Sequence, residues 1–252
     1  MRITRILASL SLAVIITFAL SGCSETYKTP GAGANMARLF ESADEEIQDI
    51  VKRTPESPLP ANIVVMRLQD AYYHSYSMHG QNIRKGPYTI ITTRDIEEQQ
   101  DFDRIRNLPQ VAQIGHINRL LLPDNITSEK DLRIAAAKLH ADMLYIYTVD
   151  TKYWTDDQSR PLSVITVGLA PTVNLHMIST VSGVLYDVRT GYVYGAVEAT
   201  EKQDQVTSWW SNQDDVDRAR LVVERKSFVK MIDELEKLWT SVVAERSTVI
   251  VK

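Results

Sequence analysis

The stretch Leu132–Val149, with the sequence LRIAAAKLHADMLYIYTV, decides the fold. Its first part repeats apolar residues at three- and four-residue steps, a spacing that predicts a helix with one buried face. That face comprises Leu132, Ala135, Ala136 and Leu139, and the preceding Ser128–Asp131 supplies capping residues. Asp142 then leads directly into the β-rich run Met143–Val149. A helix that enters a strand through so short a link is typical of an α/β unit.

Further strand patterns lie on both sides of this unit. Apolar and β-branched runs predict strands at Asn62–Tyr73, Tyr88–Thr93, Val111–Leu122, Leu162–Leu169, Val173–Val188 and Tyr192–Thr200, with a last edge strand at Thr248–Val251. Asp187–Gly191 is expected to be the turn of an antiparallel hairpin, because Gly191 takes a positive φ at little cost. The polar segment Glu201–Asn212 is expected to be a loop.

Helical spacing predicts three more helices. One follows a cap at Asn35 and runs to Val51, and a short one opens on Asp95 and Glu98 and ends at Ile105. The longest begins at Asp214 or Asp215. Its buried stripe is Phe228, Met231, Ile232, Leu235, Leu238, Trp239 and Val242, with the charged residues from Glu224 to Lys237 outside. The predicted fold class is therefore α/β (mixed α+β), a mixed sheet with an antiparallel hairpin, packed helices and a long C-terminal helix.

The N-terminal segment has the order of residues found in a secretory signal. Met1–Arg5 is basic, Ile6–Leu20 is mostly apolar, and Leu20-Ser21-Gly22-Cys23 follows, with the only cysteine of the chain at its end. These four residues resemble the lipobox of bacterial lipoproteins. The resemblance implies that the Cys23 thiol receives a diacylglycerol, that the chain is cut before Cys23, and that the new amino group is acylated, for example with palmitate.

Two alternatives to a lipid anchor are an uncleaved transmembrane helix and a plain secreted protein. The apolar run is near the lower length limit for spanning a bilayer, and a plain secreted protein would not explain the position of Cys23. Lipoproteins are sorted by the residue after the cysteine, and Ser24 in place of aspartate implies the outer membrane, with the inner membrane as the alternative. The expected organisation is a signal peptide over 1–22, a lipidated tether over 23–34, and one periplasmic α/β domain over 35–252.

Composition narrows the classes of function. The chain has 252 residues, 28 basic and 32 acidic, and a net charge of −4. This balance does not favour nucleic-acid binding, which requires a basic patch or stripe. With one cysteine there is no internal disulfide, so stability is expected to come from packing.

Candidate binding residues are few. Trp209 and Trp210 lie between polar neighbours, which favours a loop; the two rings are candidates for a partner-binding patch, but rings of this kind more often fold back onto the sheet. The ring-rich segment Tyr72–His79 is expected to be a loop rather than a metal site, because His74 and His79 lack the helical metal-ligand spacing. No nucleophile elbow, phosphate-binding loop or paired-cysteine motif is present, so the sequence predicts no enzyme, no cofactor and no metal.

The order of elements resembles the small α/β domain of certain periplasmic lipoproteins. Ala135–Asp142 entering a strand and the hairpin Gly183–Gly191 are similar to segments of the curli-secretion channel subunit and of the lipoprotein activators of penicillin-binding proteins. A closer likeness, over Leu132–Val243, is to the rhombotarget lipoproteins, carried by Leu162–Gly168 through Tyr186-Asp187. These motifs are structural, so the resemblance implies a fold more than a function.

The sequence supports three hypotheses for function. The first is a lipid-anchored, periplasm-facing outer-membrane lipoprotein that acts through protein contacts in envelope assembly, bound to the membrane through Cys23. The second is a subunit of an oligomeric secretion channel, in which the hairpin Val173–Thr200 enters the membrane despite His176, Arg189 and Glu198. The third is an enzyme on the same fold.

Overall fold

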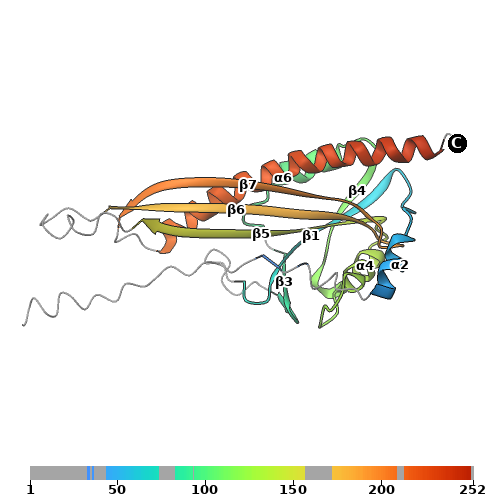
Figure 1. The fold of residues 1–252 in the computed structure, drawn as a ribbon, viewed down its shortest axis with the longest axis horizontal. Helices are drawn as coiled ribbons and strands as arrows, with labels where there is room; N and C mark the ends of the chain where they lie inside the picture. The colour runs from blue at the N-terminus through green and yellow to red at the C-terminus, as the bar shows by residue number, and fades with distance from the viewer. Residues whose placement is uncertain are drawn as a thin grey trace, which may run out of the picture.

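The computed structural model describes residues 33–34, 36, 44–73, 83–92, 94–156, 172–208 and 213–250. They form a mixed α/β fold around one twisted sheet (Figure 1). Its strands are β1 (Ala61–Asp70), β2 (Ile83–Lys85), β3 (Tyr88–Ile91), β4 (Val111–His116), β5 (Met143–Asp156), β6 (Thr172–Asp187) and β7 (Val193–Ser208). The helices are α2 (Asp44–Val51), α3 (Gln99–Arg106), α4 (Glu129–Lys138) and α6 (Gln213–Ile250), with a short 3-10 turn η3 at Arg119–Leu121.

Strand β1 is the branch point of the sheet. The main order is β2-β3-β1-β5-β6-β7, and β4 also pairs with β1. On one edge β1 runs parallel to β5. The other edge is shared, because β4 pairs in parallel up to Val65 and β3 pairs antiparallel from Arg67 onward. β4 and β3 therefore share this edge of β1 and diverge at Met66.

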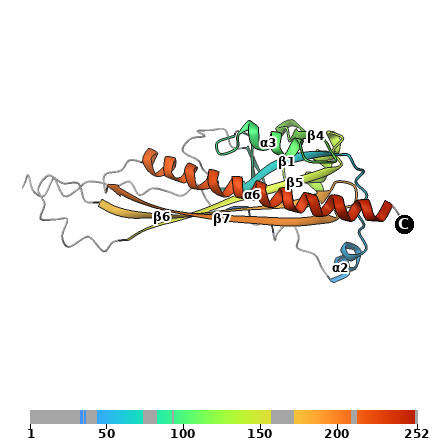
Figure 2. The ribbon, with the colours of Figure 1, turned by 90° about the horizontal axis from the view of Figure 1, so that it is seen from above.

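Helices cover both faces at the end of the sheet near the β6–β7 turn. On one face Leu132, Ala135 and Ala136 of α4 pack against Leu144 and Ile146 of β5. On the other face α3 and α6 pack against the opposite side of the same strand. α6 has 38 residues, about 57 Å at 1.5 Å per residue, and lies along β6 and β7 beyond the three-layered end (Figure 2).

The hairpin that the sequence predicts is confirmed, and it is longer than expected. β6 and β7 pair from Thr172↔Ser208 to the turn, where Gly191 has φ of +71°. The segment Glu201–Asn212 was predicted to be a loop, but β7 continues through Ser208. Asp204, a polar residue of this segment, is accommodated in the strand because its Oδ1 lies 2.7 Å from His176 Nδ1 of β6 on the exposed face.

Other predictions at element boundaries were wrong. The predicted strand Val111–Leu122 ends at His116, and η3 follows, which turns Leu122 into the core. Thr248–Ile250 continues α6 instead of forming an edge strand. The capping box of α3 is Glu98 with Asp101, not Asp95 with Glu98. Asp95 instead binds a buried arginine, as described below.

Several side chains differ from their predicted burial. Leu139 is the C-cap of α4 and is 38% exposed, because the buried stripe ends one turn earlier. Ile47, Ile50 and Val51 of α2 are exposed, although their spacing predicted a buried face. Glu224 is buried, since it pairs with Arg220 at 2.6 Å.

The folded domain begins earlier in the sequence than predicted. Gly33 forms a bridge with Gln69, and the Ala34 N–H donates to Thr148 Oγ1 at 2.9 Å. Both residues, predicted to belong to the tether, therefore contact the sheet. The predicted strand Leu162–Leu169 lies outside the described residues.

Candidate functional site

The candidate site lies where β1 separates from β5. Their pairing ends at Met66↔Ile146, while both strands continue. The side chain of Gln69 fills the gap, because its amide accepts from Val149 N at 2.9 Å and donates to Val149 O at 2.8 Å. The Thr148 hydroxyl also donates to Gln69 Oε1 at 2.7 Å. A side chain thus replaces a backbone partner and satisfies buried polar groups of β5.

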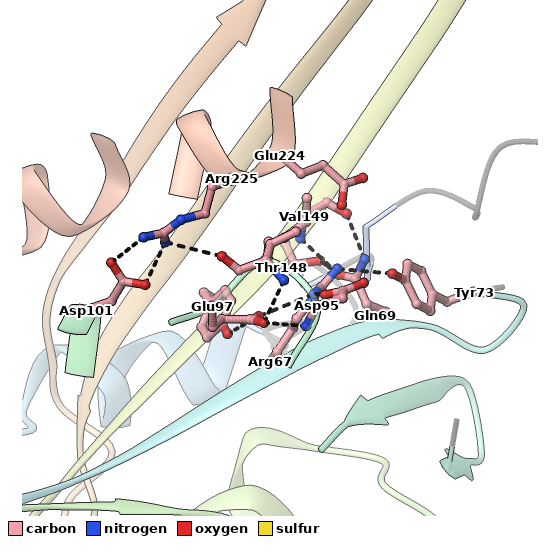
Figure 3. A network of polar contacts seen from close by, with 12 residues as sticks. Arg67, Gln69, Tyr73, Asp95, Glu97, Asp101, Thr148, Val149, Glu224 and Arg225 are labelled. Carbon is pink, nitrogen blue, oxygen red and sulfur yellow. Dashed lines mark hydrogen bonds and ion pairs between the residues drawn. The ribbon is translucent and has the colours of Figure 1, made fainter. Parts of the chain in front are cut away.

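Arg67 is the centre of a buried ionic network beside this gap (Figure 3). Its Nη1 lies 2.6 Å from Asp95 Oδ1 and 3.3 Å from Glu97 Oε1, and its Nη2 donates to Tyr73 OH at 3.1 Å. The Tyr147 hydroxyl donates to Glu97 Oε1 at 2.6 Å. The side chains of Arg67, Asp95 and Glu97 are 1%, 5% and 2% exposed, so solvent hardly screens these charges.

A second arginine site continues the network on α6. Arg220 binds Asp217 at 2.8 Å and Glu224 at 2.6 Å, and Thr151 of β5 donates to Glu224 at 2.7 Å. Ser179 of β6 lies 3.2 Å from the Thr151 hydroxyl. These contacts tie α6 to β5 and β6 through buried polar groups.

A third contact joins α6 to α3. Arg225 binds Asp101 with both terminal nitrogens, at 2.6 and 3.0 Å, and donates to the Ile96 carbonyl (Figure 3). Asp101 is also the N3 residue of the α3 capping box. The arginine therefore fixes the start of α3 against α6.

Burial and neighbouring charges set the protonation of the network. Burial alone would lower the pKa of Arg67, but Tyr73, Glu97 and Asp95 offset this and hold its pKa well above the usual value. Burial raises the pKa of Tyr147, and the adjacent Glu97 raises it further. At neutral pH Arg67 is therefore a cation and Tyr147 a neutral hydrogen-bond donor.

A small cavity of about 70 Å³ borders the network at the fork between β3 and β4. Its walls combine apolar residues such as Val65 and Ile90 with the polar groups of Arg67, Glu97 and His116. A water molecule needs roughly 10–15 Å³, so the cavity has room for several small polar groups. It is far smaller than the roughly 300–1,000 Å³ of pockets that hold drug-sized ligands.

His116 ends β4 at the rim of this cavity. Its ring meets the Phe102 ring edge-on, with centroids 4.5 Å apart. Partial burial, with the cations Arg94 and Arg106 nearby, lowers the pKa of His116 to about 4. The imidazole is therefore neutral at neutral pH.

An aromatic surface lies at the far end of β5. Trp154 is 46% exposed and stacks on His176 of β6, with centroids 5.4 Å apart and an interplanar angle of 16°. His176 Nδ1 lies 2.7 Å from Asp204 Oδ1 of β7. The three residues share one face of the sheet across three strands, which makes Trp154 an exposed anchor on an ordered platform.

The residues predicted from the sequence as sites, Cys23, Trp209 and Trp210, lie outside the described part of the chain. His74 and His79, predicted to belong to a loop and not to a metal site, also lie there. Tyr72 and Tyr73, which were grouped in one loop, separate: Tyr72 is 78% exposed, and Tyr73 is buried against Arg67. Searched over the described residues alone, no group of histidine, cysteine or acidic side chains has the geometry of a metal site.

Sequence reasoning missed Arg67 and Trp154. Arg67 interrupts the run Ile63–Leu68, and a charge inside a buried strand is rare unless it is paired. That signal alone would have predicted buried acids nearby. The sequence signal for Trp154 was weaker: it is a large aromatic residue at the point where the strand that begins at Met143 becomes polar.

No protein-family model and no curated protein matches this chain. Among the described residues, no helix is both long and apolar enough to cross a membrane. A functional proposal therefore depends on the residues and contacts of the chain itself.

Proposed function

We propose that the protein is a lipid-anchored, periplasm-facing outer-membrane lipoprotein that acts through protein contacts in envelope assembly or maintenance. The observation that carries this proposal is the single cysteine, Cys23, directly after the apolar run that ends at Leu20. Acylation on two positions would make the anchor stable, since one chain alone holds a protein only marginally.

The contacts of Gly33 and Ala34 support a short anchor. The Gly33 backbone bridges Gln69, and Ala34 donates to Thr148, so the domain begins ten residues after Cys23. Ten extended residues span at most about 33–36 Å. An anchor of this length holds the domain close to the membrane surface and favours partners in the same membrane.

The proposal of protein contacts is supported by the exposed Trp154, and Trp209 and Trp210 are proposed to contribute. β5, β6, β7 and α6 all reach the same end of the sheet, where Asp156, Thr172, Ser208 and Gln213 are their last or first residues. Trp209 and Trp210 follow Ser208 in the sequence. Tryptophan is enriched among binding hot spots because it excludes much water with few rotatable bonds.

The secretion-channel alternative is less favoured because of the packing of the hairpin. Leu175, Met177 and Val181 of β6 are at most 3% exposed and belong to clusters that include α6. Each would lose about 1.5–3 kcal/mol of burial if the hairpin left the helix. The buried contacts of the Ser179 hydroxyl with Thr151 of β5 and Ser227 of α6, at 3.2 and 3.0 Å, would also be lost.

Replacing Cys23 tests the anchor. Cys23→Ala is expected to abolish labelling by radioactive palmitate and to leave uncut precursor, whereas Ser21→Ala, a small residue for a small residue, should keep both labelling and cleavage. Labelling that persists in Cys23→Ala would exclude a lipid on this residue. Ser24→Asp should shift the protein toward the inner-membrane fraction, and an unchanged distribution would remove the reason for the outer-membrane assignment.

Replacing the two tryptophans tests the binding role. Trp209→Ala with Trp210→Ala is expected to lower recovery of crosslinked proteins from intact envelopes and to change stability by less than about 1.5 kcal/mol. A loss of several kcal/mol would instead indicate that the rings are buried.

A further inference from the structure

β7 is an edge strand of unusual length. It has 16 residues and, among the described residues, pairs with β6 alone. Typical strands have about 5–6 residues. An edge of this kind presents alternate backbone N–H and C=O groups to any strand that approaches.

Charged residues are arranged symmetrically along the middle of this edge. Glu198, Thr200 and Lys202 are exposed and lie on the face opposite α6. Glu198 and Lys202 stand two residues on either side of Thr200 and have opposite charges. A strand with this pattern is complementary to a second copy of itself turned by 180° about Thr200.

We propose that β7 is an interface at which two copies of the chain pair edge to edge, antiparallel, with Thr200 on the two-fold axis. In this register Glu198 faces Lys202 of the second copy, and the reciprocal pair forms on the other side of the axis. The strands overlap from Val193 to Thr207, and no like charges stand opposite each other. Opposite-charge pairs directly across strands contribute about 0.2–1 kcal/mol each.

The same charges disfavour neighbouring registers. If the two-fold axis passed Glu201 instead, Glu201 of one copy would face Glu201 of the other, and Glu198 would face Asp204. An axis at Glu198 or at Lys202 also places like charges opposite each other. An axis at Ala199 avoids repulsion but forms neither ion pair and shortens the overlap. An axis at Gln203 pairs Lys202 with Asp204 without repulsion, but the strands then overlap only from Glu198 to Ser208.

α6 leaves the edge of β7 accessible. Leu238 lies above Gly195, and Lys226 and Lys230 reach Gln203 and Glu201 through side-chain atoms. These contacts are on the face of β7, not on its hydrogen-bonding edge. In the proposed dimer both copies of α6 lie on the same face of the joined sheet.

Cysteine crosslinking of the full-length protein in mild detergent tests the register. Thr200→Cys places two thiols opposite each other, where paired residues have Cβ atoms about 4.5–5.5 Å apart, and mild oxidation should give a covalent dimer on a non-reducing gel. Thr180→Cys is the matched control, because it breaks the same hydroxyl contact but lies one strand inward. Ala196→Cys is an exposed control on β7 itself, four residues from the axis.

The outcomes separate the proposal from its alternatives. A dimer in Thr200→Cys, with both controls at the level of the unsubstituted protein, supports it. Equal crosslinking in all three variants would indicate random collision and overturn it, as would no dimer in Thr200→Cys. If Thr200→Cys in intact envelopes links to a different polypeptide instead, the edge binds another protein and the self-pairing is wrong.

Charge reversal gives an independent test. Glu198→Lys and Lys202→Glu should each halve the particle mass measured by light scattering, from dimer to monomer. The double variant should restore the dimer, because it exchanges the two charges and keeps their complementarity. An unchanged mass in both single variants, or failure of the double variant to recover, would overturn the register. The light-scattering result does not depend on whether Cys23 carries a lipid, and a free Cys23 thiol would show itself as crosslinking of the unsubstituted protein.

Discussion

Replacing Arg67 with methionine would remove the cation that Asp95 and Glu97 bind while keeping a side chain of similar length. The two carboxylates have 5% and 2% exposed side chains, so water cannot readily replace the guanidinium. Removing one member of a buried ion pair typically costs about 3–5 kcal/mol. A domain of this size shifts its Tm by about 2–4 °C per kcal/mol, so the expected loss is about 6–20 °C.

Arg104 supplies a matched control on the surface. It also binds two carboxylates, Asp233 at 2.6 Å and Glu236 at 2.9 Å, but all three side chains are 31–49% exposed. Surface ion pairs contribute about 0.2–1 kcal/mol. With two such pairs, Arg104→Met should therefore lower Tm by about 1–8 °C.

Circular dichroism during heating, repeated in urea, measures both variants under the same conditions. If Arg67→Met costs as little as Arg104→Met, the buried network does not stabilise the fold through charge pairing. A triple variant, Arg67→Met with Asp95→Asn and Glu97→Gln, removes the unpaired charges as well. It should recover part of the loss, because the uncompensated carboxylates and not the missing contact account for most of the cost.

Three further predictions concern the hairpin and the aromatic surface. Burial raises the pKa of Asp187, but hydrogen bonds from Thr190, Ser57 and Glu56 lower it more, to below its usual value. The ionised carboxylate therefore stabilises the fold at pH values above its usual pKa, and this stabilisation is lost in acid. Asp187→Asn should lower Tm near pH 7 and make the decrease of Tm between about pH 5 and 3 smaller. A decrease of Tm in acid equal to that of the unsubstituted protein would contradict this. Gly191→Val should lower the free energy of unfolding by about 1–3 kcal/mol, because the residue has φ of +71°. Ala196→Val, at an exposed position of β7, should leave Tm unchanged, and equal changes in Tm for both variants would exclude backbone strain at Gly191 as the cause. Trp154→Ala should lower partner crosslinking with a stability loss under about 1 kcal/mol, while Trp239→Ala, 1% exposed, should cost about 3–5 kcal/mol; a large loss for Trp154→Ala would place that ring in the core.

The sequence predicted the parts of the fold that local patterns determine. The α4–β5 unit was predicted correctly because apolar periodicity and a capping box both occur within Ser128–Val149. The turn at Asp187–Gly191 was predicted because glycine at a positive φ is a local requirement. The stripe on α6 from Phe228 to Val242 was correct for the same reason.

The failures occurred where tertiary contacts decide. The polar end of β7, Glu201–Ser208, is a strand because β6 pairs with it along its whole length. Glu224 appears in the sequence as a surface residue of a charged helix, and Arg220 and Thr151 bury it. The Arg67 network joins residues from β1, β3–α3 and β5 that no single periodicity connects.

The position of the tether constrains how partners could approach an anchored domain. The Ala34 N–H donates to Thr148 Oγ1 of β5, and a side chain at Gly33 would meet Thr148 and Asp150, on the face of the sheet opposite α6. Trp154 follows on the same face of the same strand, two alternations beyond Asp150. A chain anchored at Cys23 leaves from this face, and its ten residues reach at most about 33–36 Å. If Cys23 is acylated as proposed, the face that carries Trp154 is the one on which the tether enters the domain, while α6 lies on the opposite face. A partner of the same membrane could then reach Trp154 from the side of the anchor, and the edge of β7 faces neither side.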